Sequence, residues 1–280
     1  MKRFICKVLV FLLVIALITI PVEIYKIHHA SVYAERINGG EVYTAINKSQ
    51  TKKVVKRLVL GDSVGHQLYP CEQYYDSIVS LACNKAITLA GQFFLLKNFV
   101  EINIDDLPEE IILLITPFSL SNDVDKYAYQ YFLKPFPPSN YSKFYTEHLF
   151  QRIHSIPMYW TANIPFIQTS NYTPQWAVVP FQQEPKSISQ LSYEYLLKID
   201  SVANTNNIKF RMLSTPVRDD RQCDVATFWE NLPAEYMSKL PKLLQSYKES
   251  IVYLPHEWYY DAVHFGEGKI PNDYLNLLSD

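Results

Sequence analysis

Two short polar segments near opposite ends of the chain contain the residues best suited to chemistry. Residues 61–63 (Gly-Asp-Ser) follow the apolar run 58–60, and residues 261–264 (Asp-Ala-Val-His) lie near the C-terminus. Glycine tolerates the tight turn that presents a side chain at the carboxyl end of a strand. A serine hydroxyl becomes a good nucleophile when a base accepts its proton and a third group orients that base. Ser63, His264 and Asp261 are therefore candidates for the nucleophile, the base and the orienting carboxylate.

Such widely separated residues need a scaffold that brings them together. The chain alternates strand-like apolar runs with helical segments and lacks hairpin turn signals, a pattern typical of a parallel sheet with helices on both faces. We therefore predict an α/β fold, a three-layer α/β/α sandwich with a parallel, flavodoxin-like sheet. Ligands of such sheets bind at the carboxyl ends of the strands, and we expect Ser63 at such an end.

Apolar periodicity predicts the individual elements. Residues 110–116 form a continuous apolar run, as in a strand covered on both faces, and residues 187–204 have the spacing of an amphipathic helix. The predicted strands are 54–60, 86–89, 110–116, 208–213 and 251–254, and the predicted helices are 91–102, 141–155, 187–204, 234–248 with a break at Pro241, and 272–278.

The N-terminus predicts a membrane anchor. Basic residues at positions 2 and 3 precede a stretch that is apolar from residue 4 to residue 22, apart from Cys6 and Lys7. A spanning helix needs ~20 such residues, and preceding basic residues stay in the cytoplasm. We expect residues 1–25 to be a signal-anchor, 26–52 a linker and 53–280 an extracytoplasmic domain. A cleaved signal peptide is the alternative, with weak cleavage signals at 32–34.

Composition and cysteine usage narrow the list of partners. The net charge is -2, 19% of the 280 residues are charged, and no basic cluster stands out, so we expect no nucleic-acid partner. An oxidising compartment would allow a disulfide between Cys71 and Cys83; the alternative is that these two and Cys223 are buried thiols. No Cys or His spacing is typical of zinc, so we expect neither a metal nor a cofactor.

The Gly-Asp-Ser and Asp-x-x-His segments, in this order at the two ends of one α/β domain, resemble those of the SGNH hydrolases, the GDSL esterase/lipase family. The resemblance covers residues 54–264 and implies catalysis by Ser63, His264 and Asp261. It also implies two oxyanion donors, a glycine amide and an asparagine side chain, for which Gly91 and Asn122 are the matching positions. The family pattern before that asparagine is Gly-x-Asn-Asp, and Leu120 replaces its glycine here.

For a membrane-anchored protein, the resemblance predicts hydrolysis of O-acyl esters. The expected substrate is cell-envelope carbohydrate or a small ester, and the expected acyl group is acetyl. An O-acetyltransferase of an exopolysaccharide or cell-wall glycan is an alternative, because a sugar hydroxyl can take the acyl group from the same acyl-enzyme. Two further alternatives are a catalytically inactive subunit that only binds its partner and a lipase. Residues 159–183, rich in Trp, Tyr, Asn and Gln, suit either a sugar-binding surface or an insertion packed by its own aromatics.

Other polar residues near these segments have expected roles as well. Asp62 is expected to fix the turn by hydrogen bonds, and His66 to be structural or to face the substrate. Gln67 and Gln92 are expected to line the pocket. His148 and His154 are expected to be structural or exposed, and the pair at 256–257 (His-Glu) has the wrong spacing for the family.

Overall fold

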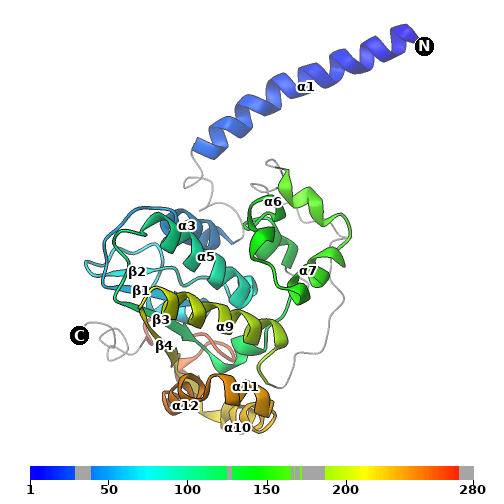
Figure 1. Ribbon diagram of the computed structural model, residues 1–280. Coiled ribbons are helices and arrows are strands. Elements are labelled where there is room, and N and C mark those ends of the chain that lie inside the picture. The colour runs from blue at the N-terminus through cyan, green and yellow to red at the C-terminus, as the bar shows by residue number, and fades with distance from the viewer. Residues whose placement is uncertain (29–38, 125–127, 165–166, 168–170, 172–186, 271–280) are drawn as a thin grey trace.

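The computed structural model describes residues 1–28, 39–124, 128–164, 167, 171 and 187–270. Its first element is the long helix α1 (Lys2–His28), which contains Pro21 and precedes an α/β domain (Figure 1). The segment Lys2–Val22 of α1 spans 21 residues, is strongly apolar and contains no buried residue. It is long and apolar enough to cross a membrane, as the sequence predicts for residues 1–25.

A four-stranded parallel sheet in the order β2-β1-β3-β4 forms the centre of the domain. Leu58 of β1 lies opposite Val79 of β2 and Ile111 of β3, and Ile111 lies opposite Phe210 of β4. This order matches the first four strands of a flavodoxin-like sheet. The predicted α/β sandwich with a parallel sheet is confirmed. The strands are β1 (Arg57–Gly61), β2 (Ile78–Ser80), β3 (Glu110–Ile115) and β4 (Lys209–Ser214).

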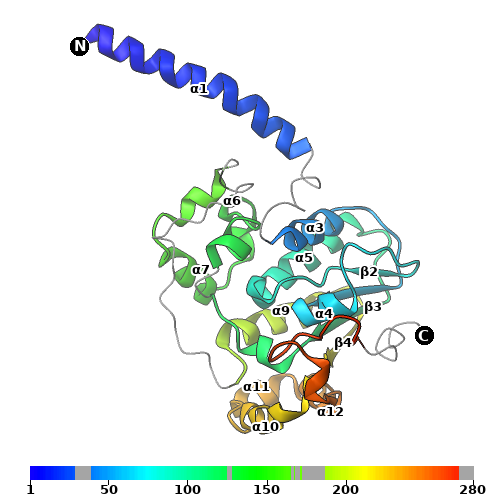
Figure 2. The same ribbon diagram turned by 180° about the vertical axis from the view of Figure 1, so that it is seen from behind.

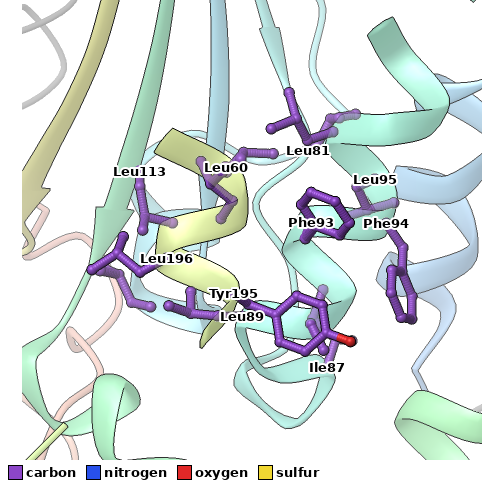
Figure 3. Close-up of a cluster of buried hydrophobic side chains, with 14 of the residues drawn as sticks. Leu60, Leu81, Ile87, Leu89, Phe93, Phe94, Leu95, Leu113, Tyr195 and Leu196 are labelled. Carbon is purple, nitrogen blue, oxygen red and sulfur yellow. The ribbon is translucent and has the colours of Figure 1, made fainter. Parts of the chain in front are cut away.

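Alternate residues of the central strands enter two different cores. Leu58 and Leu60 of β1 belong to the larger core, whereas Val59 belongs to the smaller one. All six residues of β3 are buried, because side chains alternate between two covered faces. Figure 3 shows part of the larger core, where aromatic and aliphatic side chains of α5 and α9 pack near the sheet residues Leu60 and Leu113.

The two faces are covered unequally (Figures 1 and 2). Helices α3 (Gly40–Ser49), α5 (Thr88–Ile102), α9 (Gln190–Thr205) and α12 (Pro241–Glu249) contribute to the larger core. The smaller core is closed by α4 (Ser63–Leu68) and by Tyr259 and Phe265. The C-terminal segment around His264 is therefore itself part of the layer that covers the second face.

The remaining elements lie between β2 and α5, between β3 and α9, and after β4. After β4 the chain pairs again in a short parallel sheet of β5 and β6. These elements are η1 (Lys85–Ile87), η2 (Pro117–Ser121), η3 (Tyr129–Leu133), α6 (Pro138–Tyr141), η4 (Ser142–Phe144), α7 (Glu147–His154), η5 (Tyr159–Asn163), β5 (Val217–Arg218), η7 (Asp219–Arg221), α10 (Gln222–Glu230), α11 (Ala234–Lys239), β6 (Tyr253–Leu254) and η8 (His256–Trp258).

Several predicted elements are shifted and one is wrong. Strands expected at 54–60, 110–116, 208–213 and 251–254 correspond to β1, β3, β4 and β6, and the helix at 234–248 is divided at Pro241 into α11 and α12. The strand predicted at 86–89 is absent, because these residues form η1 and the first turn of α5; the strand beside β1 is Ile78–Ser80. The helix predicted at 272–278 lies outside the described residues.

The expected linker at 26–52 also needs correction. Helix α3 lies within it and buries Val42, Ala45, Ile46 and Ser49 against the larger core. These positions have the i, i+3, i+4, i+7 spacing of an amphipathic helix, a signal that the polar residues around them obscure. The folded domain therefore starts near Gly40 instead of residue 53.

The predicted disulfide is not formed. Cys71 and Cys83 are free, buried thiols, and Cys223 is free and exposed. Both buried cysteines pack as part of the larger core, and the Cys71 thiol donates a hydrogen bond to the carbonyl of Glu41 at 3.4 Å. The alternative of buried thiols thus holds for two of the three cysteines of the domain.

Candidate active site

The turn between β1 and α4 is held by Asp62, which caps the helix. Its Oδ1 accepts hydrogen bonds from the amides of Val64 and Gly65, both at 3.0 Å, and its Oδ2 accepts one from Thr116 at 2.9 Å. A side chain that caps a helix in this way satisfies amides that the helix leaves unpaired. Because Thr116 follows β3, Asp62 also joins the carboxyl ends of two neighbouring strands, and its expected role in the turn is confirmed.

Glycines at both ends of this turn allow a close approach to β3. A Cβ atom at Gly61 or at Gly65 would lie 2.5 Å from the carbonyl oxygen of Leu114. No side chain fits at that distance from a fixed backbone oxygen. The two glycines of the Gly-Asp-Ser-Val-Gly sequence therefore allow the turn that carries Ser63 to pack directly against β3.

Ser63, His264 and Asp261 form one hydrogen-bonded chain. The Ser63 Oγ lies 2.8 Å from His264 Nε2, and His264 Nδ1 lies 2.8 Å from Asp261 Oδ2. A proton on Nδ1 donates to the carboxylate and leaves the Nε2 lone pair for the serine hydroxyl, so one tautomer satisfies both contacts. The structure thus brings together all three side chains that the sequence predicts, from positions about two hundred residues apart.

Asp261 is held in place by its own backbone. Its Oδ1 accepts the amides of Val263 and His264, each at 2.7 Å. Partial burial raises the pKa of Asp261, but these two hydrogen bonds and the one from the His264 ring outweigh it, so the pKa lies below the usual value. The carboxylate therefore stays charged beside the imidazole. The side chains of His264 and Asp261 are 22% and 40% exposed, which leaves the pair open to solvent.

Two glutamines clamp backbone segments of the site. Gln67 of α4 donates to the Phe265 carbonyl at 3.2 Å and accepts from the Phe265 amide at 3.0 Å. Gln92 of α5 likewise donates to the Gly61 carbonyl at 2.6 Å and accepts from the Gly61 amide at 3.2 Å. These side chains were expected to line the pocket. Gln67 instead connects α4 to the loop that carries His264, and Gln92 fixes the end of β1.

Arg218 supports the same loop from β5. Its guanidinium donates to the carbonyl of Asp261 at 2.8 Å and makes a two-point contact with the Asp220 carboxylate at 2.6 and 2.8 Å. Sequence reasoning misses this residue because its target is a backbone carbonyl 43 positions away.

The two predicted oxyanion donors have different surroundings. Gly91 is buried in the first turn of α5, where an added Cβ would lie 2.6 Å from the Ile87 side chain. An amide four residues after the helix cap bonds to the cap carbonyl, so Gly91 has a packing role and the structure gives its predicted donor role no support. Asn122 follows η2, and its amide nitrogen donates to the Lys85 carbonyl at 3.4 Å. Its role as an oxyanion donor stays a prediction.

The loop that carries Asn122 is firmly anchored. The Asn122 carbonyl accepts hydrogen bonds from the hydroxyls of Ser189 and Ser192 at 2.7 and 3.3 Å. Asp123 contacts His148 of α7 at 2.8 Å, which gives that histidine the structural role expected for it. Because β3 and β1 are parallel neighbours, this loop and the turn that carries Ser63 both follow carboxyl ends of strands, at the same edge of the sheet.

The other histidines and the aromatic segment lie outside the hydrogen-bonded chain. His66 contacts Glu72 at 2.7 Å, His154 bonds the Phe150 carbonyl, and His256 and Glu257 are both exposed. Of the segment 159–183, Trp160 is exposed and Asn163 accepts from the Ser139 amide. The residues at 172–183 lie outside the described part of the chain, so the expected sugar-binding surface stays a prediction.

Comparisons of the chain with models of protein families, with curated proteins and with solved structures found no match. What the residues 61–63 and 261–264 do must therefore be inferred from the fold and from the hydrogen-bonded chain that connects them.

Proposed function

We propose that this protein is a serine esterase of the SGNH type that hydrolyses O-acyl esters. The observation that carries the proposal is the chain from Ser63 through His264 to Asp261, with both hydrogen bonds at 2.8 Å. A nucleophile, a base and an orienting carboxylate within hydrogen-bonding reach are the requirement for acyl transfer by serine. The same chain of contacts favours a catalytic over a binding-only role.

The reaction follows from the geometry. Ser63 Oγ attacks the ester carbonyl while His264 Nε2 takes its proton, and Asp261 stabilises the imidazolium. The tetrahedral intermediate expels the alcohol, which receives the proton from Nε2, and an acyl-enzyme remains. Water then gives its proton to Nε2 and attacks the acyl carbonyl, and the proton returns to Ser63 as the carboxylic acid leaves.

Two groups are proposed to stabilise the oxyanion. The amide of Ser63 is at the first position of α4, where a helix supplies no partner, and Asp62 takes the amides of Val64 and Gly65 instead. The second is the Asn122 side chain, whose 3.4 Å contact with Lys85 is long enough to be exchanged for a better acceptor. Loss of one such donor typically costs ~10²–10³ in kcat.

The substrate is proposed to be an O-acylated, specifically O-acetylated, carbohydrate outside the cytoplasm. The membrane-spanning potential of α1 and the basic residues at its start support this address. Tyr260 lies next to His264: the residue is 69% exposed, and its ring stacks on that of His264 with the centroids 5.7 Å apart. An exposed aromatic face at this position suits the flat face of a sugar ring.

The acceptor decides between an esterase and an O-acyltransferase, which share the acyl-enzyme. The solvent exposure of His264 and Asp261 favours water as the acceptor of the acyl group. The test uses the full chain in detergent with a p-nitrophenyl acetate substrate, with and without an oligosaccharide acceptor. We expect release of p-nitrophenol and of free acetate, both lost in Ser63→Ala and retained in the exposed control Ser238→Ala. Acetyl transfer to the oligosaccharide would move the assignment to the transferase; no release from a folded chain would refute both.

A further inference from the structure

Three metal-binding side chains meet beside the nucleophile helix. The ring nitrogen of His66, the sulfur of Cys71 and a carboxylate oxygen of Glu72 all lie within 4.8 Å of one another. Within the described ranges, no other group of three or more such residues is found. The proposed ester chemistry uses none of the three. Four residues separate His66 from Cys71, and Glu72 follows directly. This spacing does not predict a zinc site from the sequence, and the fold brings the three side chains together.

The turn that presents these side chains is anchored from two sides. Lys48 of α3 donates to the carbonyls of Cys71 and Gln73, both at 2.8 Å. The hydroxyl of Ser80 in β2 donates to the carbonyl of Tyr69 at 2.5 Å. The donors at 71 and 72 therefore sit on a fixed backbone, and a preorganised set of ligands loses less conformational entropy when it binds an ion.

The donor set selects among metals. A thiolate, an imidazole and a carboxylate are all zinc ligands, whereas magnesium and calcium prefer oxygen alone. Tetrahedral zinc separates its N, O and S ligands by about 3.3–3.7 Å, given bond lengths of about 2.0–2.3 Å. The present 2.7 Å contact between His66 and Glu72 must therefore open by less than about 1 Å to admit an ion. The imidazole–carboxylate hydrogen bond is the interaction that the metal replaces.

Charge and access are also compatible with a divalent cation. Zinc binds the thiolate form of cysteine, so an entering ion would displace the Cys71 thiol proton to solvent. The resulting thiolate and the Glu72 carboxylate would offer the ion two negative charges, and the Lys48 ammonium is held by the carbonyls of Cys71 and Gln73. The side chains of His66 and Glu72 are 25% and 49% exposed, so an ion can reach the site from solvent.

We propose that His66, Cys71 and Glu72 form a zinc site, with water as the fourth ligand. Bound zinc would tie the last turn of α4 to the segment after it, close to Ser63 but outside the acyl-transfer reaction. The site does not depend on the proposed esterase function, because its readout is metal binding.

Cobalt(II) provides a direct test on the full chain in detergent after treatment with a chelator. We expect a thiolate-to-cobalt charge-transfer band and the visible bands of a tetrahedral ion, both removed by an excess of zinc. Cys71→Ser should abolish the charge-transfer band. The matched controls Cys83→Ser, at the other buried thiol, and Cys223→Ser, at an exposed one, should retain it.

Variants of the exposed ligands decide the proposal even if Cys71→Ser disturbs the buried core. Competition with a chromophoric chelator should show zinc affinity weakened about tenfold or more in His66→Ala and in Glu72→Gln, with unchanged circular dichroism. A cobalt spectrum without a charge-transfer band, or zinc affinity equal to wild type in both variants, would overturn the site. Neither result bears on Ser63, whose reactivity is measured separately.

Discussion

Asp62 precedes Ser63 in the chain, and Asp261 is linked to it through His264, but the two carboxyl groups lie in different environments. Asp62 is fully buried, and burial raises its pKa despite hydrogen bonds from Ser119 and three backbone amides. Asp261 is partly exposed, and its hydrogen bonds keep its pKa below the usual value. The sequence indicates the roles of Ser63, Asp261 and Asp62, because each depends on residues close to it along the chain. Gln67 and Arg218 act on distant backbone groups, which no local pattern reveals.

Asp261→Asn tests the orienting role of the carboxylate. The amide side chain keeps the size of Asp261 but removes its charge, so it no longer stabilises the imidazolium or selects the reactive tautomer. In a Ser-His-Asp site this change lowers kcat by ~10⁴. We expect a loss of this order in kcat for ester hydrolysis, against no change in Asp224→Asn on α10. Activity within tenfold of wild type would exclude Asp261 as the orienting group.

Gln67→Ala tests the clamp between α4 and the histidine loop. Truncation leaves the amide and carbonyl of Phe265 without their partner and loosens His264, one residue earlier. Misplacement of a reacting group lowers the rate more than it lowers binding, so we expect kcat to fall about 10- to 100-fold with KM near wild type. Steady-state kinetics measure both, with Gln245→Ala on the exposed face of α12 as the control. A change confined to KM would show that Gln67 contacts substrate instead.

At the scale of elements, the parallel sheet helps to explain why the segments at 61–63 and 261–264 meet, because Ser63 follows the carboxyl end of β1. Strands β1 and β3 are predictable because buried apolar residues run through them without a break, at 58–60 and 111–115. Strand β4 is only partly buried, and Pro216 after it marks its end. Strand β2 has only three residues, Ile78–Ser80, too few for a periodic signal, and the apolar residues after it resemble a strand but begin a buried helix. The helix α3 is hidden in a polar stretch, where tertiary packing decides the structure.

Glu110 connects the amino ends of three strands and gives the sheet a pH dependence. It lies between Arg57 and Lys209 in register and contacts the Arg211 guanidinium at 2.6 Å. Burial raises its pKa, but the hydrogen bonds from Arg211 and Lys209 and their positive charges outweigh it, so the pKa is lowered. A lowered acid pKa stabilises the fold above the unfolded-state value of about 4.3, and this stabilisation is lost as the pH falls through the folded-state value.

Glu110→Gln should therefore lower the free energy of unfolding at pH 7 by about 2 kcal/mol, the typical contribution of hydrogen bonds to charged groups. Urea unfolding measures it, with the exposed neighbour in Glu109→Gln as the control. The difference between Glu110→Gln and wild type should shrink as the pH drops below about 4.3. A difference independent of pH would contradict the role assigned to the charge.

At the scale of the whole molecule, the protein consists of an α/β domain preceded by a helix long and apolar enough to cross a membrane. The length and apolarity of Lys2–Val22 are evident from the sequence, and so are the basic residues at its start, Lys2 and Arg3. The side of the membrane on which the domain lies is part of the proposed function, and it follows from the charge asymmetry around the helix. The cysteines give a direct way to measure it, because Cys223 is exposed while Cys71 and Cys83 are buried.

A membrane-impermeant maleimide added to intact cells should label Cys223 if the domain is extracytoplasmic. Because Cys6 is also exposed, the experiment uses a Cys6→Ser background. There Cys223→Ser should remove the label, and lysis before labelling should not increase it. Labelling of Cys223 only after lysis would place the domain in the cytoplasm and exclude an envelope substrate.

The central claim is that His264 and Asp261 activate Ser63 as a nucleophile. The most direct measurement is reaction of the folded, full-length protein with a fluorophosphonate probe, followed by mass spectrometry of the labelled peptide. We predict modification of Ser63 alone, lost in Ser63→Ala, strongly slowed in His264→Ala and unchanged in Ser238→Ala. An unlabelled wild-type protein, or a label that persists in Ser63→Ala, would contradict the claim.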